Sequence, residues 1–183
     1  MLVMAGDDML SFVPMIGLNI GLVSLIGRSV GARNMDKANE VITAGFVIGI
    51  GYSAVLGLIY IVFRFPLVDV FAPPTGDFSE IRLLAAFMMV GLSCYTMADA
   101  TIQVCGGVLR GAGDTRWVMY TSTALHWIML VIQYLVIRVW DFGPQASWIV
   151  FCVLIVAIAA AFLLRLLGGR WRDAEALRQV MAE

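Results

Sequence analysis

One acidic residue, Asp99, lies inside a long apolar stretch, and its position suggests a function more directly than any other feature of the chain. The stretch runs from Leu83 to Leu109, which is long enough to cross a bilayer. At about 1.5 Å per residue, Asp99 lies roughly 16 Å along a helix axis from Arg110, well inside a hydrocarbon core about 30 Å thick. A carboxylate there costs about 2.5 kcal/mol or more, so it normally faces a helix-bundle interior or a wet cavity. Such a group can bind a proton or Na⁺.

Three further residues share the helical face of Asp99. Tyr95 lies four residues before it, and Gln103 and Gly106 lie four and seven residues after it. These spacings place all four on one side of an α-helix, which predicts a polar stripe in an otherwise apolar helix. Two interpretations remain. Either the stripe is a functional cation site, which the rarity of intramembrane acids favours, or it is a structural stripe whose acid stays permanently neutral.

Two other polar residues in apolar stretches are candidates for lining a cavity. Asn19 contacts either a substrate or a neighbouring helix, and we favour an interhelical hydrogen bond. His126 is the only histidine of the sequence. It either handles protons or bonds to a neighbouring helix, and we favour the bond. A single histidine cannot form a histidine cluster for a metal, so the predicted metal role is limited to Na⁺ at Asp99, with no structural metal.

The composition is typical of a membrane protein. Hydrophobic residues make up 61% of the chain and charged residues 14%, with a mean hydropathy of +0.92. In soluble domains about 45–50% of the residues are apolar and about 25% are charged. The net charge of -1 provides no basic surface for nucleic acid. Cys94, Cys105 and Cys152 all lie in apolar stretches and form no CxxC pair, so we expect neither disulfides nor zinc, and no cofactor beyond a coupling ion.

Five apolar stretches predict an all-α membrane protein. Residues 1–167 are expected to form a bundle of transmembrane helices in contact with membrane lipids, and residues 168–183 a polar cytoplasmic tail. The predicted spans cover about residues 10–26, 41–63, 83–109, 117–137 and 147–167.

Small residues indicate where these spans approach one another. In the second span they recur every four positions, at Gly45, Gly49, Ser53 and Gly57. This spacing predicts a helix–helix seam. Gly17 and Gly21 form a pair of the same type in the first span.

Two polar segments between spans carry local signals. The segment from Arg64 to Ser79 contains Phe-Pro-Leu and Pro-Pro-Thr-Gly, which predict a helix break and an exposed turn. Asp114 lies just before the fourth span, where we expect it to be the N-cap of that helix.

The distribution of basic residues predicts the orientation. With five spans, the segments after the first, third and fifth lie on one side and contain nine Lys and Arg residues, against three on the opposite side. Because basic loops remain in the cytoplasm, we expect the C-terminus to be cytoplasmic.

Two motifs resemble a transporter family. Residues Gly107–Thr115 read Gly-Val-Leu-Arg-Gly-Ala-Gly-Asp-Thr and follow a span with an acid eleven residues before the arginine. This element resembles the MATE (multidrug and toxic compound extrusion) family, and Leu25–Asn34 is similar to the loop after that family's eighth helix. The resemblance covers essentially the whole chain. It implies that the five spans correspond to helices eight to twelve of a twelve-helix transporter built from two six-helix lobes, so that the chain is a C-terminal part.

The resemblance also implies a function. Members of this family export organic, often cationic, drugs or toxic compounds across the cell membrane and couple this export to Na⁺ or H⁺. In bacterial members an acid in the tenth helix, with a tyrosine one turn earlier, belongs to the cation site, and Asp99 and Tyr95 occupy these positions. Gln103, Asn19 and His126 are the candidates for lining the cavity. The resemblance further implies the bacterial inner membrane as location and a missing N-terminal lobe, in the same or a separate chain, as partner.

Three other functions compete with this one. A lipid-linked saccharide flippase of the same superfamily would line its cavity with several basic residues, whereas no Lys or Arg lies centrally in a predicted span. A membrane enzyme such as a phospholipid-synthesising transferase would need several acids at one membrane face to hold a metal, whereas Asp99 is alone in its span. The third is a truncated remnant without transport activity of its own.

Overall fold

A computed structural model describes residues 2–70, 79–169 and 171 of the chain. In these residues it contains only helices and turns, as predicted. Part of the predicted turn before Ser79 and most of the predicted tail lie outside them. The elements are α1 (Leu2–Gly31), α2 (Met35–Val62), α3 (Arg64–Asp69), α4 (Ser79–Gly111), α5 (Thr115–Tyr134), the π-helical turn η1 (Leu135–Val139) and α6 (Pro144–Leu167).

Five of the helices are long and apolar enough to cross a membrane. Their apolar parts are Phe12–Gly31, Met35–Val62, Glu80–Gly111, Thr115–Val139 and Pro144–Leu167. Each overlaps one predicted span and continues beyond it, because a helix satisfies its own backbone hydrogen bonds and need not end where its apolar side chains end. Helix α4, with 33 residues, is about 50 Å long, clearly longer than the hydrocarbon core.

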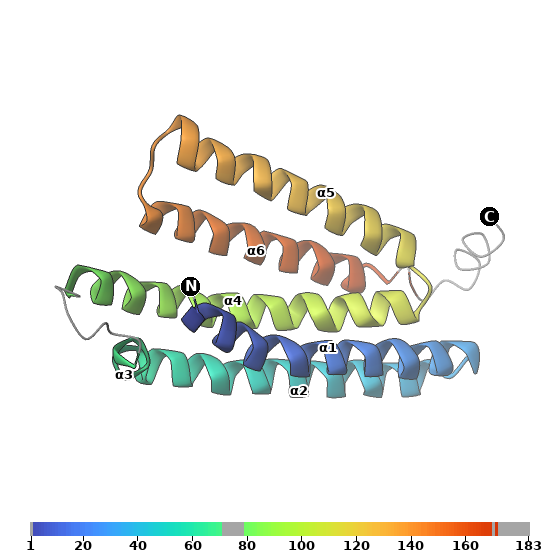
Figure 1. The fold of residues 1–183 in the computed structure, drawn as a ribbon. Coiled ribbons are helices and arrows are strands. Elements are labelled where there is room, and N and C mark those ends of the chain that lie inside the picture. Colours follow the sequence, from blue (N-terminus) through green and yellow to red (C-terminus); the bar gives the residue numbers. More distant parts are fainter. Residues whose placement is uncertain (1, 71–78, 170, 172–183) are drawn as a thin grey trace.

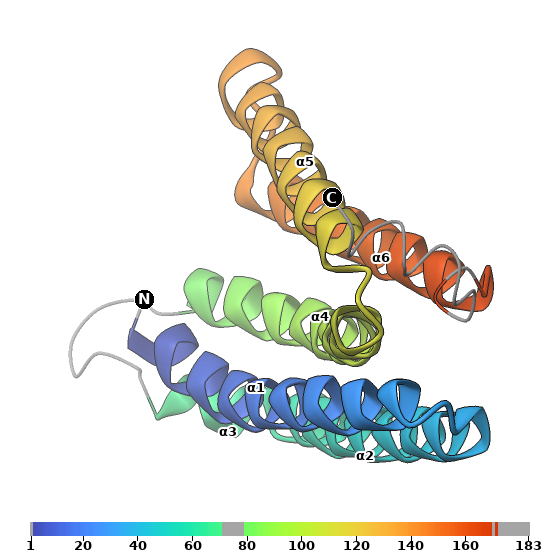
Figure 2. The ribbon, with the colours of Figure 1, turned by 90° about the vertical axis from the view of Figure 1, so that its right-hand side faces the viewer.

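Helix α4 is the centre of the bundle (Figure 1). It packs against α1 and α2 on one side and against α6 on the other. The hairpin of α5 and α6 diverges from the α1–α2 pair, as Figure 2 shows. Only 6% of the residues in the apolar part of α5 are buried, so α5 is the least covered of the five long helices.

The predicted seam of small residues on α2 is confirmed. A Cβ atom added at Gly45 would lie 2.8 Å from Leu22 of α1, and one added at Gly49 would lie 3.0 Å from Val104 of α4. Further along, the Ser93 hydroxyl of α4 donates a hydrogen bond to the backbone oxygen of Gly57 over 3.0 Å. The strip therefore packs α2 against two helices at once.

The second predicted glycine pair, Gly17 and Gly21, does not form a seam within the described chain. Apart from the neighbouring residues and backbone of α1 itself, no atom of the described chain lies within 4 Å of a Cβ added at either position. Each glycine is two residues from Asn19, which corresponds to about 200° around the helix. Because Asn19 faces α4, both glycines face away from α4. The close approach of α1 and α4 instead uses glycines on α4. A Cβ added at Gly107 would lie 3.0 Å from the backbone oxygen of Asn19, and one at Gly111 would lie 2.7 Å from that of Val23.

The segment after α2 differs from the predicted exposed turn. The helix does end at Val62, with Phe63 as its C-cap, but the chain then forms α3, with Pro66 in the first turn, where its missing N–H group is not needed. Arg82 of α4 donates two hydrogen bonds, of 2.6 and 2.7 Å, to the Asp69 carboxylate. These bonds hold the pKa of Asp69 below its usual value, and they tie α3 to α4.

Asp114 occupies the predicted N-cap position of α5, but its side chain makes no capping hydrogen bond. Its carboxylate instead accepts a hydrogen bond of 2.8 Å from Arg165 of α6, with the two side chains 15% and 20% exposed. The Arg165 guanidinium also lies over the Trp117 ring, 5.1 Å from its centroid. A charged partner outcompetes the backbone amides for the carboxylate, and this contact closes the bundle at the end where α4 stops.

We expect Gly111→Ala to destabilise the chain by about 1–3 kcal/mol, because the new methyl group would meet the backbone of α1. Unfolding of the purified chain in detergent by denaturant measures this change. Gly51→Ala is the matched control, because no atom lies within 4 Å of a Cβ there. Equal stability of the two variants would contradict the close approach of α1 and α4.

We expect Asp114→Ala to cost about 1–3 kcal/mol, since it removes a charged hydrogen bond and leaves the Arg165 guanidinium partly buried without it. A double-mutant cycle with Arg165→Ala in the same unfolding assay isolates the coupling of the two side chains. The Asp69–Arg82 pair, 45% and 42% exposed, is the control and should couple far more weakly. Additive effects of the two substitutions would show that the Asp114–Arg165 contact contributes nothing.

Candidate cation site on helix α4

The predicted stripe lies on one face of α4. Tyr95, Asp99 and Gln103 are all partly buried, and the Asp99 carboxyl group and the Gln103 side chain are hydrogen-bonded to each other. The Tyr95 ring stacks on Phe151 of α6, with the centroids 5.8 Å apart. The stripe therefore begins beside α6 and continues, one helical turn at a time, toward the contact of α4 with α1.

Asn19 joins α1 to this stripe. It is 6% exposed, and its side-chain amide donates a hydrogen bond of 2.6 Å to the backbone oxygen of Gln103. Of the two alternatives for this residue, the structure therefore shows the interhelical bond. Such a bond satisfies a polar amide that would otherwise be costly in an apolar setting.

Arg110 is a member of the site that the sequence did not indicate. Its guanidinium donates a hydrogen bond of 3.2 Å from Nη1 to the Oδ1 atom of Asn19. The guanidinium lies beside Gly106, where a Cβ atom would be in ordinary contact with it, 3.7 Å from Nη2 of Arg110. Side chains of an α-helix point toward its N-terminus. From this rule alone, the long side chain at position 110 could have been predicted to lie over Gly106.

His126 lies apart from the stripe. It is exposed on α5, and its Nδ1 atom lies 2.7 Å from the backbone oxygen of Ser122, one turn earlier in the same helix. The favoured bond to a neighbouring helix is therefore not the one that the structure shows. The physical reason is the sparse packing of α5 against the other helices.

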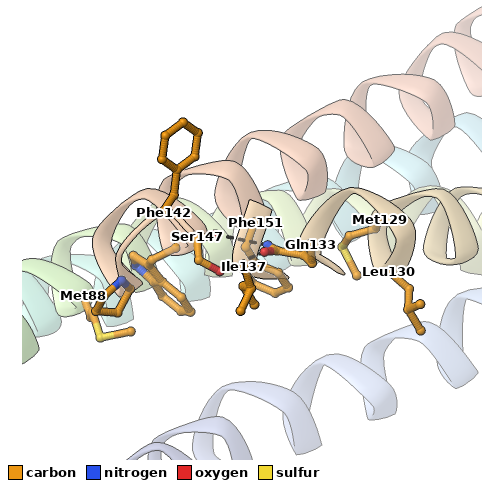
Figure 3. Close-up of a pocket in the computed structure, with 10 residues that line it drawn as sticks. Met88, Met129, Leu130, Gln133, Ile137, Phe142, Ser147 and Phe151 are labelled. Carbon is orange, nitrogen blue, oxygen red and sulfur yellow. Dashed lines mark hydrogen bonds between the residues drawn. The ribbon is translucent and has the colours of Figure 1, made fainter. Parts of the chain in front are cut away.

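A pocket of about 640 Å³ lies between α4, the end of α5 and α6 (Figure 3), and it borders the Tyr95 end of the stripe through one shared residue. Phe151 connects the two, because it lines the pocket and stacks on both Tyr95 and Trp148. Inside the pocket, the Ser147 hydroxyl donates a hydrogen bond of 2.8 Å to the Gln133 side-chain oxygen. The Gln133 amide donates one of 3.1 Å to the Ser147 backbone oxygen. The lining residues are Met88, Met129, Leu130, Gln133, Ile137, Phe142, Pro144, Ser147, Trp148 and Phe151.

The donor set at Asp99 restricts the kind of ion that fits. Within the described part of the chain, no three His, Cys, Asp or Glu side chains lie close enough together to hold a metal ion. One carboxylate with neighbouring neutral oxygens, as from Gln103 and Tyr95, carries a single negative charge. That charge matches a proton or a monovalent cation better than a divalent metal, which usually requires several carboxylates.

Comparisons with known proteins identify the family. The sequence model of the MatE family matches residues 6–135. The chain is similar to the "Probable multidrug resistance protein NorM" of Mannheimia succiniciproducens, with 28% identity over 163 residues that cover 85% of the chain and 34% of the relative. It is also similar to the protein of the same name from Thermotoga maritima, with 26% identity covering 90% and 35%.

A third relative is the "Multidrug resistance protein MdtK" of Photorhabdus laumondii, which is 25% identical over 86% of the chain and 35% of the relative. The chain thus spans about a third of the length of the curated relatives that it matches. The family model covers most of the chain, including nearly all of α1 and the whole of α2, α4 and α5. These helices contain Asn19, Tyr95, Asp99, Gln103 and Arg110. The chain therefore belongs to the MatE family.

Proposed function

We propose that this chain is part of a cation-coupled antiporter that exports organic, often cationic, compounds, with Asp99 as the residue that binds the coupling ion. The observation that supports this most is the position of Asp99, partly buried on the central membrane helix and hydrogen-bonded to Gln103. The names of the relatives as multidrug resistance proteins support the substrate class. The proposed activity is transport of a substrate and not its chemical conversion, so we assign no catalytic residue.

The coupling ion is either Na⁺ or H⁺. Loading neutralises the Asp99 carboxylate, and release restores a negative charge in an apolar setting, where charge is costly. This difference in free energy can bias the protein between inward- and outward-facing states. Tyr95 and Gln103 contribute their neutral oxygens to the ion, and the pocket beside Phe151 offers apolar and aromatic surface to the organic compound.

Transport requires more than this chain. Alternating access needs two halves that move against each other around a central site, and the chain corresponds to about a third of its relatives' length. We infer that the remaining lobe and one further helix come from the same or a separate chain, and that the five helices correspond to helices eight to twelve. The resemblance to the family supports the bacterial inner membrane as the location, and the distribution of basic residues favours a cytoplasmic C-terminus.

The test uses a chimera in which this chain replaces the matching third of the Mannheimia succiniciproducens relative. We expect Asp99→Asn to reduce the cation-driven efflux of ethidium from cells about tenfold or more, because the amide cannot exchange a proton or neutralise Na⁺. Efflux from cells that lack their own exporters, with the membrane content of each variant measured by immunoblot, gives the result.

Glu80→Gln is the matched control, because Glu80 is an exposed acid at the start of the same helix. It should leave efflux unchanged. Undiminished cation-driven efflux by the Asp99→Asn chimera would refute the coupling role of Asp99. A chimera with the original Asp99 that is present in the membrane but inactive would favour the interpretation of the chain as a remnant.

A further inference from the structure

The two ends of the polar stripe on α4 are built differently. At one end, the guanidinium of Arg110 extends back over Gly106 and is held by Asn19 through the hydrogen bond of 3.2 Å. Arg110 as a residue is exposed, so its charge lies at the boundary between the solvent side and the buried Asn19. The nearest polar side chain of the stripe, that of Gln103, is one helical turn from Gly106.

Four helices converge at the level of Gly106. Asn19 comes from α1, and Phe162, which is 1% exposed, comes from α6. A Cβ atom at Gly106 would lie 3.6 Å from the Phe162 ring and 3.9 Å from the Asn19 amide. Trp117 of α5 packs edge-on against Phe162, with the centroids 5.4 Å apart. Side chains therefore close the stripe on this side.

The opposite end of the stripe borders a pocket. Tyr95 adjoins Phe151, which lines the pocket of about 640 Å³ between α4, α5 and α6. Asp99 thus lies between an end that side chains close and that carries a positive charge, and an end that borders a mainly apolar pocket. A cation that approaches Asp99 from the Arg110 side meets the positive charge of that guanidinium.

We propose that Arg110, held over Gly106 by Asn19, is an electrostatic barrier that excludes cations from one end of the stripe, so that Asp99 exchanges its ion through the Tyr95 end in this conformation. A guanidinium remains charged at all relevant pH values, and an arginine at a constriction is an effective means of excluding cations. Asn19 is a positioning residue, because it holds the guanidinium at the constriction and touches no ion itself. The inference builds on the proposed function of Asp99.

The experiment measures access to the stripe and does not depend on transport. Cys94, Cys105 and Cys152 are replaced by Ala in the chimera, and Gln103→Cys supplies a reporter thiol. The backbone oxygen of residue 103 remains available to Asn19. The reporter is treated with a cationic and an anionic methanethiosulfonate reagent of similar size in vesicles of both orientations. Lys37→Cys, in a separate variant, identifies the side that corresponds to the Arg110 end, because Lys37 is exposed at the start of α2 near that end.

From the Arg110 end, we expect the cationic reagent to react about tenfold more slowly than the anionic one, relative to their rates with a free thiol. Arg110→Gln should abolish this preference, and Arg110→Lys should retain it, because the charge is kept. Asn19→Ala should weaken it, because the guanidinium is no longer held. Arg28→Ala, at an exposed arginine near the end of α1, is the control and should change nothing.

Equal acceleration of both reagents by Arg110→Gln would overturn the proposal, since it would indicate a steric plug without charge selection. An unchanged ratio in Arg110→Gln, with Arg110→Lys and Asn19→Ala also unchanged, would overturn it as well. A shifted ratio together with undiminished export by Asp99→Asn would support the barrier and refute the coupling role of Asp99, so the two proposals fail separately.

Discussion

The close contact between α1 and α4 is the constraint on which the candidate site depends. Gly107 and Gly111 let the two backbones approach, and this approach brings the Asn19 amide to 2.6 Å from the Gln103 backbone oxygen. An amide in an apolar bundle is costly unless it is paired. Once Asn19 is fixed in this way, its side-chain oxygen is in position to accept a hydrogen bond from the Arg110 guanidinium. A single tight seam thus organises polar groups over several turns of α4.

The contact gives this multi-pass membrane protein of the MatE family an asymmetric polar stripe. Helices α1 and α6 flank α4 on different sides. Both reach its stripe at Gly106, and beyond that level α6 contacts Tyr95 and α1 contacts Gln103. The Asp114–Arg165 pair strengthens the closed end from outside the stripe. The less tightly packed α5 borders the pocket at the Tyr95 end. Rigidity at one end and a pocket at the other fit the role proposed for Asp99 between them.

The sequence was sufficient for features that depend on one helix alone. Run length and hydropathy located five helices, and four-residue spacing identified the seam of α2 at Gly45 and Gly49. Features that depend on the choice of partner were not predictable. Gly17 and Gly21 show the same spacing as Gly107 and Gly111, and only the relative rotation of α1 and α4 decides which pair forms the contact. The direction of the Arg110 side chain likewise depends on Asn19, a residue 91 positions away.

The rate at which a hydrophobic carbodiimide modifies Asp99 tests the central claim most directly. Modification is followed by mass spectrometry in the membrane-embedded transporter, at several pH values and with Na⁺ or with choline at equal ionic strength. Because the reagent attacks the protonated acid, an exchanging site predicts a rate that falls as pH rises or as Na⁺ is added. A permanently neutral structural acid would react at the same rate under every condition, and that result would contradict the role assigned to Asp99.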